Sequence, residues 1–370
     1  MTGRMRPLAL GNGWQQCQKA RREAAMKAAR LHAFDAALEL DEVPAPEITG
    51  PFDVIVRVGG AGFCRTDLHI MQGWFNDVIP VELPVVLGHE NAGWVEAVGP
   101  QVANLAVGDA VVLHPRMSCG MCRACRMGRD MHCAEFVFSG VTSPGGFAEY
   151  VKTSARAVVK LPAGVEPEDV AAHADAGVSA YHAAKKAAAV LYPGARAVVI
   201  GAGGVGHIGI QCLRALSPAE IVVVDKSPEA LGLARECGAE HTVVADGGQA
   251  EAVGELTDGG GAQVVLDFVG EGTVTDGVAM LGAGGSYFVV GYGDTLSVPT
   301  MQMVLTETSF IGNLVGSYID LVELIALVAK GKVISHNRTY PLGAVNDVLN
   351  DLKEGRLQGR GILVPEGATA

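Results

Sequence analysis

The sequence predicts an α/β protein in which a β-rich domain is joined to a second domain built on a doubly wound parallel sheet. From Met26 to about Ala172, short strand-like runs alternate with Gly and Pro, which is typical of β-rich structure. From Ala174 onward, apolar strand-like runs alternate with helical stretches, the pattern of a parallel sheet covered by helices. The 49 glycines and the low aromatic content suit many tight turns between strands and helices.

The individual elements follow from these patterns. In the first region the expected strands are Val54–Val58, Pro84–Leu87, Gly93–Val98, Ala110–Leu113 and Ala148–Val151. In the second region the expected elements are helix Ala176–Val190, strand Ala197–Ile200, helix Gly206–Leu216 and strands Ile221–Val224, Gln263–Asp267 and Ser286–Val290. The final segment, with helix Asp320–Lys330 and strand Gly361–Val364, is expected to return to the first region.

Length and charge exclude several classes of function. A chain of 370 residues has room for two or three domains. The net charge of −12 argues against nucleic acid as a partner, because nucleic-acid binding normally needs a basic face. No apolar run approaches the roughly 20 residues that span a bilayer, so we expect no membrane association and a soluble, cytoplasmic protein.

Residues 1–25 are biased toward Arg and Lys, and we expect a disordered or weakly helical extension in which Cys17 is a free thiol.

Four cysteines form the strongest motif of the chain. Cys119, Cys122, Cys125 and Cys133 have C-x2-C-x2-C-x7-C spacing, which can close around one tetrahedral Zn²⁺ and leaves no position for substrate. Two disulfides are the alternative, but thiols stay reduced in the cytosol. The spacing does not meet the C-x2-C-x2-C-x3-C-P pattern of iron–sulfur ligation. We therefore predict a structural zinc in the segment 119–133.

A glycine-rich turn predicts a dinucleotide site. It fits G-x-G-x-x-G between an expected strand and an expected helix, with cofactor-binding candidates Gly201, Gly203, Gly204, Val205 and Gly206. Such glycines allow the tight turn and let the backbone approach a pyrophosphate at the helix N-terminus. Asp225 ends the next strand, where its carboxylate can bind a ribose 2′-hydroxyl and would repel a 2′-phosphate. This favours NAD over NADP. Lys226 is a further candidate for the ribose, with an exposed salt-bridging lysine as the alternative.

Two short segments predict a second metal site. The run Gly62–His69 brings a thiol, a hydroxyl, a carboxylate and an imidazole close together in sequence, and Gly88-His89-Glu90 follows a strand-like segment. Cys64 and His89 are credible ligands for a second zinc, although a catalytic zinc needs three protein ligands and an open position.

With these motifs in their order, the chain resembles the zinc-dependent medium-chain alcohol dehydrogenases over about residues 26–365. The shared motifs are Gly62–His69, Gly88–Glu90, the four-cysteine segment and Gly201–Gly206. The resemblance implies a GroES-like catalytic domain made of residues 26–174 and 311–370. It also implies a Rossmann NAD-binding domain made of residues 175–310.

The resemblance implies the ligands of the catalytic zinc. Cys64 and His89 match two of them, and Asp175 stands where many members supply a second cysteine. Carboxylate in place of thiolate keeps the net charge of the site and makes the ligand set harder. Aspartate at this position resembles a bacterial and archaeal branch that acts on secondary and aryl alcohols. The alternative for Asp175 is an N-terminal cap of the helix Ala176–Val190.

Further roles also come from the resemblance. It implies Glu90 as a supporting carboxylate or transient ligand, and Asp67 as the acceptor that orients His89. Thr66 matches the hydroxyl that takes the substrate's proton. The proton then passes through the nicotinamide ribose to His69, which matches the imidazole that delivers it to solvent. Ordinary turn hydrogen bonding is the alternative for both residues. Arg65 matches a family position that often contacts the cofactor pyrophosphate. The resemblance also implies four residues that line the substrate pocket: Trp74, Phe75, Leu314 and Val315.

The predicted function is reversible hydride transfer between NAD and an apolar secondary, cyclic or aromatic alcohol, with one catalytic and one structural zinc per chain. The alternatives are a zinc-dependent polyol dehydrogenase, a zinc-free quinone or enone reductase and a non-catalytic cofactor-binding regulator. The apolar segment Ser297–Val315 lies where the family pairs subunits, so we expect a homodimer or homotetramer. The remaining cysteines and histidines are expected to be packing or surface residues: Cys212, Cys237, His32, His114, His132, His173, His182, His207, His241 and His336.

Overall fold

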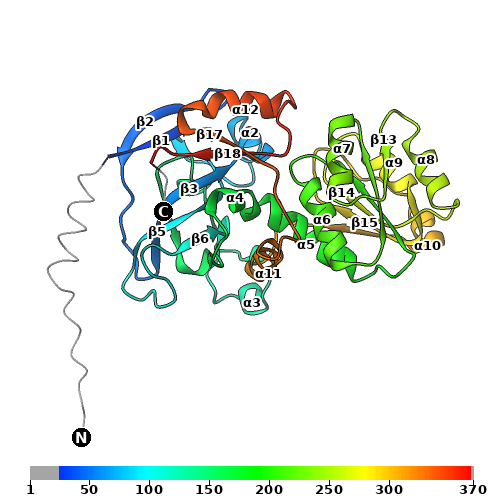
Figure 1. The fold of residues 1–370 in the computed structure, drawn as a ribbon, viewed down its shortest axis with the longest axis horizontal. Coiled ribbons are helices and arrows are strands. Elements are labelled where there is room, and N and C mark those ends of the chain that lie inside the picture. The colour runs from blue at the N-terminus through cyan, green and yellow to red at the C-terminus, as the bar shows by residue number, and fades with distance from the viewer. Residues whose placement is uncertain (1–24, 368–370) are drawn as a thin grey trace, which may run out of the picture.

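The computed structural model describes residues 25–367, which form two domains side by side (Figure 1). The β-rich domain contains both ends of the described chain, and the parallel-sheet domain is made from its middle. The predicted extension 1–25 and Cys17 lie outside the described residues, except for residue 25. Within residues 25–367, no helix is long and apolar enough to cross a membrane.

The β-rich domain is built on a seven-stranded sheet in residues 25–367, with the order β10-β6-β5-β3-β18-β17 and with β9 also paired to β3. A three-stranded sheet, β2-β1-β4, and the two-stranded β7-β8 complete the domain. Its strands are β1 (Ala25–Leu31), β2 (Glu39–Pro44), β3 (Asp53–Gly62), β4 (Val85–Val86), β5 (Glu90–Val98), β6 (Ala110–Leu113), β7 (Arg116–Met117), β8 (Val137–Phe138), β9 (Tyr150–Ser154), β10 (Val158–Lys160), β17 (Asn337–Pro341) and β18 (Arg360–Val364).

The C-terminal segment completes the β-rich domain. Strand β18 pairs antiparallel with the end of β3, where Ile362 lies opposite Gly62. The long central pair β3 and β5 buries alternating apolar side chains such as Val54, Val56 and Val58 in the core of this domain. The predicted return of the chain to its first region is therefore observed, and it brings β18 next to the segment that carries Cys64.

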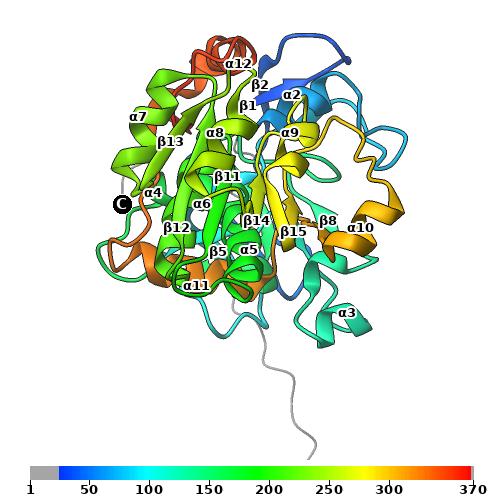
Figure 2. The ribbon, with the colours of Figure 1, turned by 90° about the vertical axis from the view of Figure 1, so that its right-hand side faces the viewer.

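The second domain contains a parallel sheet of six strands within the described part of the chain, in the order β13-β12-β11-β14-β15-β16. The strands are β11 (Arg196–Ile200), β12 (Glu220–Asp225), β13 (His241–Val244), β14 (Ala262–Asp267), β15 (Leu281–Val289) and β16 (Ser309–Gly312). Apolar residues on the two faces of the sheet pack into two separate hydrophobic cores. Because both faces are buried, the sequences of these strands are nearly continuous runs of Val and Ile. Figure 2 shows helices in front of this sheet, at the side of the molecule that carries the second domain.

The helices cover the sheets and connect the domains. They are α2 (Arg65–Met71), α3 (Arg123–Arg126), α4 (Pro167–Val170), α5 (Ala176–Ala188), α6 (Gly206–Leu216), α7 (Pro228–Glu236), α8 (Gln249–Leu256), α9 (Val274–Ala279), α10 (Thr300–Thr306), α11 (Tyr318–Val328) and α12 (Val345–Lys353), with 3-10 turns η1 (Asp130–His132), η2 (Ala155–Ala157), η3 (Ala171–Ala174) and η4 (Leu342–Ala344). The structure confirms the predicted α/β class, and most predicted elements differ from the observed ones only at their ends. Several strands differ more: β3 extends to Gly62, β5 begins at Glu90 and β15 at Leu281, while β9 begins two residues after the predicted Ala148 and β4 keeps only the central residues of Pro84–Leu87.

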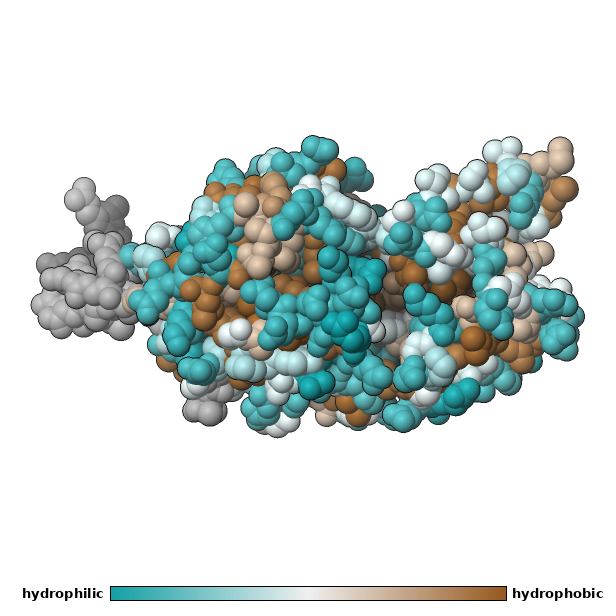
Figure 3. Space-filling model, turned by 90° about the horizontal axis from the view of Figure 1, so that it is seen from above, coloured by the Kyte–Doolittle hydropathy of each residue, from teal (hydrophilic) through white to brown (hydrophobic). Residues whose placement is uncertain are grey.

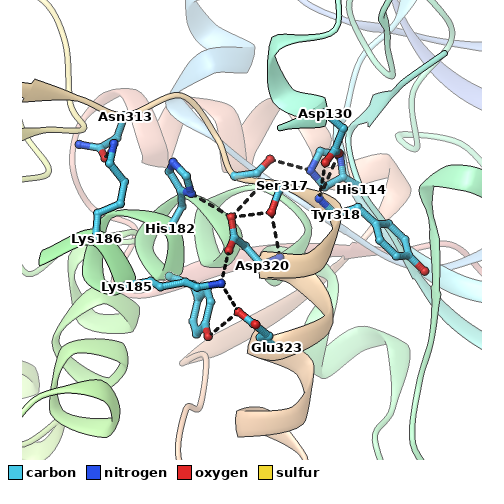
Figure 4. Close-up of polar contacts among 12 residues, drawn as sticks. His114, Asp130, His182, Lys185, Lys186, Asn313, Ser317, Tyr318, Asp320 and Glu323 are labelled. Carbon is cyan, nitrogen blue, oxygen red and sulfur yellow. Dashed lines mark hydrogen bonds and ion pairs between the residues drawn. The ribbon is translucent and has the colours of Figure 1, made fainter. Parts of the chain in front are cut away.

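A polar network between α5 and α11 joins the two domains (Figure 4). Asp320 lies at its centre, where it accepts hydrogen bonds from the backbone N–H and hydroxyl of Ser317 and pairs with His182 at 2.8 Å and Lys185 at 3.0 Å. Ser317 in turn caps the first turn of α11. Asp130, which lies within the four-cysteine segment 119–133, accepts the Tyr318 backbone N–H, so this segment is tied to the same helix. The network therefore holds three parts of the molecule together.

We expect Asp320→Asn to lower the free energy of unfolding by about 2–3 kcal/mol, because it removes the charge that faces Lys185 and His182 while Asp320 is 3% exposed. Burial opposes ionisation of Asp320, but these partners and the Ser317 hydrogen bonds hold its pKa well below the ordinary value. The native pKa is lower than the unfolded one, so the stabilisation is complete above about pH 4 and is lost as the pH falls further. The difference in urea midpoint between wild type and variant should therefore shrink at about pH 3.

The matched control is Asp351→Asn, which removes a carboxylate from an ion pair with Arg356 in which both side chains are exposed. We expect a change of at most about 0.5 kcal/mol for this control. Equal effects of the two substitutions would contradict a structural role for the network.

Candidate active site

Three potential metal ligands converge from three separate segments. Cys64 stands at the N-cap of α2, His89 comes directly before β5, and Asp175 lies between η3 and α5. The Oδ2 atom of Asp175 lies 3.4 Å from His89 Nε2 and 4.0 Å from Cys64 Sγ. Together with Glu90, these residues form a group whose ligand atoms all lie within 4.8 Å of one another. The fold thus places the three segments that carry these residues next to one another.

The chemistry of this group fits zinc. His89 is buried, and its Nε2 atom has no hydrogen-bond partner, although buried polar atoms normally have one. Asp175 occupies the N-cap position of α5 but makes no capping hydrogen bond, so the alternative role considered for it is not observed. Although burial opposes ionisation, the neighbouring His89 keeps the pKa of Asp175 below its ordinary value. A sulfur, a nitrogen and an ionised oxygen are therefore available to one cation.

Asp67 supports two members of this group. Its Oδ1 atom lies 3.1 Å from His89 Nδ1, and its Oδ2 atom accepts the backbone N–H of Cys64 at 2.9 Å. With Nδ1 bonded to a carboxylate, the proton of a neutral His89 resides on Nδ1 and the Nε2 lone pair faces Cys64 and Asp175. This contact has the geometry that the family resemblance implied for Asp67.

A buried ion pair behind the group was missed by the sequence analysis. Glu90 accepts the backbone N–H of Ala176 at 3.0 Å through Oε1 and pairs through Oε2 with Arg360 of β18. Burial raises the pKa of Glu90 to about 7, although the charge of Arg360 opposes this rise. Arg360 also borders the glycine loop, since a Cβ added at Gly204 would lie 2.8 Å from its Nη1 atom. In the sequence, an arginine at the start of an apolar strand and a glutamate next to His89 are weak signals of this pair.

The predicted proton-transfer residues lie on the exposed side of α2. Thr66 Oγ1 and His69 Nδ1 both contact the hydroxyl of Tyr292, at 3.4 and 2.9 Å, and Tyr292 was not predicted. Trp74 stacks on the imidazole of His69 with ring centroids 4.5 Å apart and an interplanar angle of 5°. Burial, and then the charge of Arg65, lower the pKa of His69.

The predicted substrate-pocket residues divide into two groups. Trp74 is 59% exposed, and Phe75 lies 6.2 Å from the Tyr292 ring in an edge-on arrangement. Leu314 and Val315 follow β16 on the connection between the domains, where Leu314 is 43% exposed and Val315 packs against the core around α5 and α6. Figure 3 shows a hollow between the two domains, with apolar surface on the second domain beside it.

The glycine loop has the geometry that the sequence predicted. Gly201 adopts a φ of 87°, and a Cβ at Gly206 would lie 1.8 Å from the carbonyl oxygen of Gly201, so neither position accommodates a larger residue without change. A Cβ at Gly203 would meet nothing within 4 Å, so the backbone there is open to a ligand. Asp225 borders this opening and accepts the backbone N–H of Ala202 at 2.8 Å. These features fit a dinucleotide pyrophosphate and ribose; Val205 is the N-cap of α6, and Lys226 and Arg65 are exposed.

The four cysteines of the segment 119–133 lie together, and all are free thiols in the structure. Cys125 Sγ lies 4.0 Å from Cys119 Sγ and 3.5 Å from Cys122 Sγ. Backbone N–H groups of Met121 and Cys122 point at Cys119 Sγ and lower the pKa of that thiol to about 6. The segment fits a closed tetrahedral zinc site away from the Cys64 group. The predicted burial of Cys212 and Cys237 is also confirmed.

Comparison with known proteins identifies the family. Residues 50–163 match the family described as alcohol dehydrogenase GroES-like domain, and residues 204–330 match the zinc-binding dehydrogenase family. The chain is 33% identical over 350 residues to an NAD-dependent alcohol dehydrogenase of Sulfurisphaera tokodaii, with 92% of this chain and all of that protein covered. The chain belongs to the zinc-type medium-chain alcohol dehydrogenases. The family membership predicted from the motifs is thereby confirmed.

One solved structure and a second relative extend this result within the alcohol dehydrogenase family. The alcohol dehydrogenase of the archaeon Aeropyrum pernix has 45% identity and a TM-score of 0.89, over 92% of this chain and all of that one. A D-arabinose 1-dehydrogenase (NADP(+)) of Saccharolobus solfataricus is 35% identical over 92% of this chain and 97% of that protein. The family therefore includes relatives with different substrates and cofactors.

Proposed function

We propose that this protein is a zinc-dependent alcohol dehydrogenase that transfers hydride between NAD and an apolar secondary, cyclic or aromatic alcohol, giving a ketone or aldehyde reversibly. The observation that carries the proposal is the convergence of Cys64, His89 and Asp175 with an unpartnered His89 nitrogen. A catalytic zinc bound there would act as a Lewis acid, and bound NAD would accept the hydride. The four-cysteine segment would hold a second, structural zinc.

The chain's own residues have separate roles in this proposal. Asp67 fixes the orientation of His89, and the pair of Glu90 with Arg360 holds charge behind the metal group. Thr66 accepts the proton that the alcohol loses, and His69 delivers it to solvent. The loop Gly201–Gly206 and Asp225 hold the cofactor, with Asp225 favouring NAD because its carboxylate would repel a 2′-phosphate.

A polyol dehydrogenase is the second candidate, favoured by the D-arabinose 1-dehydrogenase among the relatives. Sugar hydroxyls need several polar partners, whereas Trp74, Phe75 and Tyr292 gather aromatic surface next to His69. This aromatic surface supports an apolar alcohol as the substrate.

The test is NADH formation from primary, secondary, benzylic and polyol alcohols with NAD⁺ or NADP⁺, on protein of measured zinc content. We expect turnover of apolar alcohols with NAD⁺, loss of turnover after metal removal by a chelator, and recovery with Zn²⁺. Faster turnover of sugars would replace the substrate proposal with the polyol one. No turnover by zinc-loaded protein with any alcohol would contradict the enzymatic proposal.

We also propose that the protein forms a dimer through the edge of the parallel sheet, as the first step toward any tetramer. Strand β16 lies at one edge of the sheet, and helix α10, at the margin of the second domain in Figure 2, precedes it in the chain. This helix carries Met301, Val304 and Leu305, which are 74%, 74% and 77% exposed. Three exposed apolar side chains on one short helix beside an open strand support an interface there.

We expect Leu305→Asp to halve the molar mass in solution, because a carboxylate buried in an apolar interface has no partner. Size-exclusion chromatography with light scattering measures this directly. The control is Ile334→Asp, since Ile334 is 58% exposed and lies outside the Ser297–Val315 segment. If both variants keep the mass of the wild type, the proposed interface is wrong.

A further inference from the structure

Helix α6 begins at the glycine loop and lies on the side of its domain that faces the β-rich domain (Figure 1). Gln211 of this helix donates to the carbonyl oxygen of Ile334 at 2.8 Å and accepts the Ile334 N–H at 2.9 Å. One turn earlier, Nε2 of His207 accepts the backbone N–H of His336 at 3.3 Å. Three hydrogen bonds thus join the helix that follows the glycine loop to residues 334–336, which lead into β17.

His207 also holds the glycine loop itself. Its Nδ1 atom lies 2.9 Å from the carbonyl oxygen of Gly203, and its backbone N–H donates to the same oxygen at 3.1 Å. The Gly203 carbonyl therefore accepts two hydrogen bonds from one residue and is directed toward the helix. The Cβ position of Gly203, by contrast, has no atom within 4 Å and stays open to a ligand.

The protonation state of His207 matches these two contacts. Burial lowers the pKa of His207 to about 4, and the charges of Arg360 and His336 act in the same direction, although the hydrogen bond to Gly203 opposes them. The imidazole is therefore neutral at pH 7, with one N–H and one lone pair. Because Nε2 accepts the His336 N–H, the proton lies on Nδ1 and is donated to Gly203. The imidazole is completely buried, so it lies outside the space that is open to a ligand.

The orientation of the Gly203 peptide matters for an anionic ligand. A pyrophosphate is bound at such a loop by backbone N–H groups and by the N-terminus of the following helix. A carbonyl oxygen turned toward the phosphates would repel them, and a glycine has more backbone conformations available than any other residue. The second hydrogen bond from His207 therefore disfavours the orientations of Gly203 that would oppose binding.

We propose that His207 is a positioning residue for the cofactor, which acts through Gly203 by holding the glycine loop in the conformation that binds the pyrophosphate of NAD. The inference rests on the NAD dependence proposed above. The bond from His336 to Nε2 has a different effect, since it holds helix α6 against the catalytic domain. The two ring nitrogens thus have separable roles. The sequence alone placed His207 among packing or surface residues, because nothing in the glycine motif requires an imidazole there.

The first test measures NADH binding to full-length, zinc-loaded protein by fluorescence titration. His207→Asn keeps an amide N–H near the position of Nδ1, whereas His207→Gln keeps an acceptor near the position of Nε2. We expect the Kd for NADH to rise about fivefold or more in His207→Gln and to stay within about twofold of the wild-type value in His207→Asn. Thermal unfolding should show the reverse order, with the lower midpoint in His207→Asn.

The kinetic constants should change in a matching way. We expect KM for NAD⁺ to rise in His207→Gln by about the same factor as the Kd, with kcat and KM for the alcohol changed less than about threefold. The zinc content should equal that of the wild type, because the imidazole bonds to Gly203 and His336 and not to the metal group.

The second test uses cofactor-free protein and measures hydrogen–deuterium exchange of the peptide that covers residues 201–210. A loop that has lost one restraint opens more often, so exchange should be about threefold or more faster in His207→Gln than in the wild type and in His207→Asn. The matched control in both tests is Gln211→Met, which removes two hydrogen bonds between α6 and Ile334 but none to Gly203. We expect this control to lower the unfolding midpoint and to leave the Kd for NADH within about twofold of the wild-type value.

Outcomes of the two tests separate the proposals. A wild type that binds no NADH contradicts the proposed function and with it the cofactor role of His207. A wild type that binds NADH, with the same Kd and exchange rates in every variant, overturns only the role of His207. Equal weakening in His207→Asn and His207→Gln makes His207 a packing residue, which also overturns the inference. Equal weakening in Gln211→Met assigns the effect to the contact of α6 with residues 334–336 and overturns it too.

Discussion

Replacement of Asp175 by alanine is expected to lower the zinc content from about two ions per chain to about one and to reduce kcat/KM for alcohol oxidation by about 10³-fold or more. Asp175 supplies the oxygen of the Cys64–His89–Asp175 group, and its Oδ2 atom is the one that lies close to both other ligand atoms. Without it, two protein ligands remain, which is fewer than a catalytic zinc normally has.

The side chain of Asp175 also affects buried charge, so loss of activity alone would be ambiguous. Its carboxylate lies near His89 and near the positive charge of Arg360. We therefore expect a moderate loss of stability in Asp175→Ala, and metal content must be measured on the folded protein by mass spectrometry or a colorimetric assay.

The matched variant is Asp175→Cys, which restores a negatively charged ligand of the kind that many family members have. We expect it to keep both zinc ions and a measurable fraction of the activity, while Asp175→Ala keeps only the zinc of the four-cysteine segment. If Asp175→Ala retains both zinc ions and full activity, Asp175 is not a ligand, and the third position belongs to another residue such as Glu90.

The sequence could predict those parts of the site whose residues lie close together along the chain. The four cysteines, the glycine loop and the run Gly62–His69 each lie within one turn and its neighbouring element, so their residues must lie close together in space. Asp175 was placed by its resemblance to a family ligand, and the structure brings it to Cys64 across 111 residues of chain and also next to His89.

Two contacts could not be predicted because they depend on how distant parts of the chain come together: one on the return of the C-terminal strand to the first domain, the other on how the two domains lie side by side. Arg360 meets Glu90 across 270 residues, after β18 inserts beside β3. Tyr292 meets His69 across 223 residues and from the other domain. Arg360 and Tyr292 lie outside the recognised motifs. The patterns that predict strands and loops do not specify which residues these two side chains contact. Buried charge gives a weak general signal, since Glu90 in an apolar strand requires a cation nearby.

The second large effect concerns the choice of cofactor. We expect Asp225→Asn to shift the ratio of kcat/KM for NAD⁺ to that for NADP⁺ by about 100-fold toward NADP⁺, because an amide neither repels a 2′-phosphate nor binds ribose hydroxyls as strongly as a carboxylate. Hydrogen bonds to a charged acceptor contribute about 1.5–3 kcal/mol, which corresponds to this change. Initial rates with each cofactor at saturating alcohol give the ratio.

Asparagine is preferable to alanine here because Asp225 also holds the loop. Its Oδ2 accepts the Ala202 N–H at 2.8 Å and its Oδ1 the Ser227 N–H at 2.9 Å, so removal of both oxygens would disturb the turn that contains Gly201. Asparagine keeps one acceptor oxygen, and Asp225→Ala serves to measure the cost of losing both. We expect Asp225→Ala to weaken both cofactors. An unchanged ratio in Asp225→Asn would mean that cofactor choice depends on other residues, with Lys226 the next one to replace, since it is exposed at the end of the same strand.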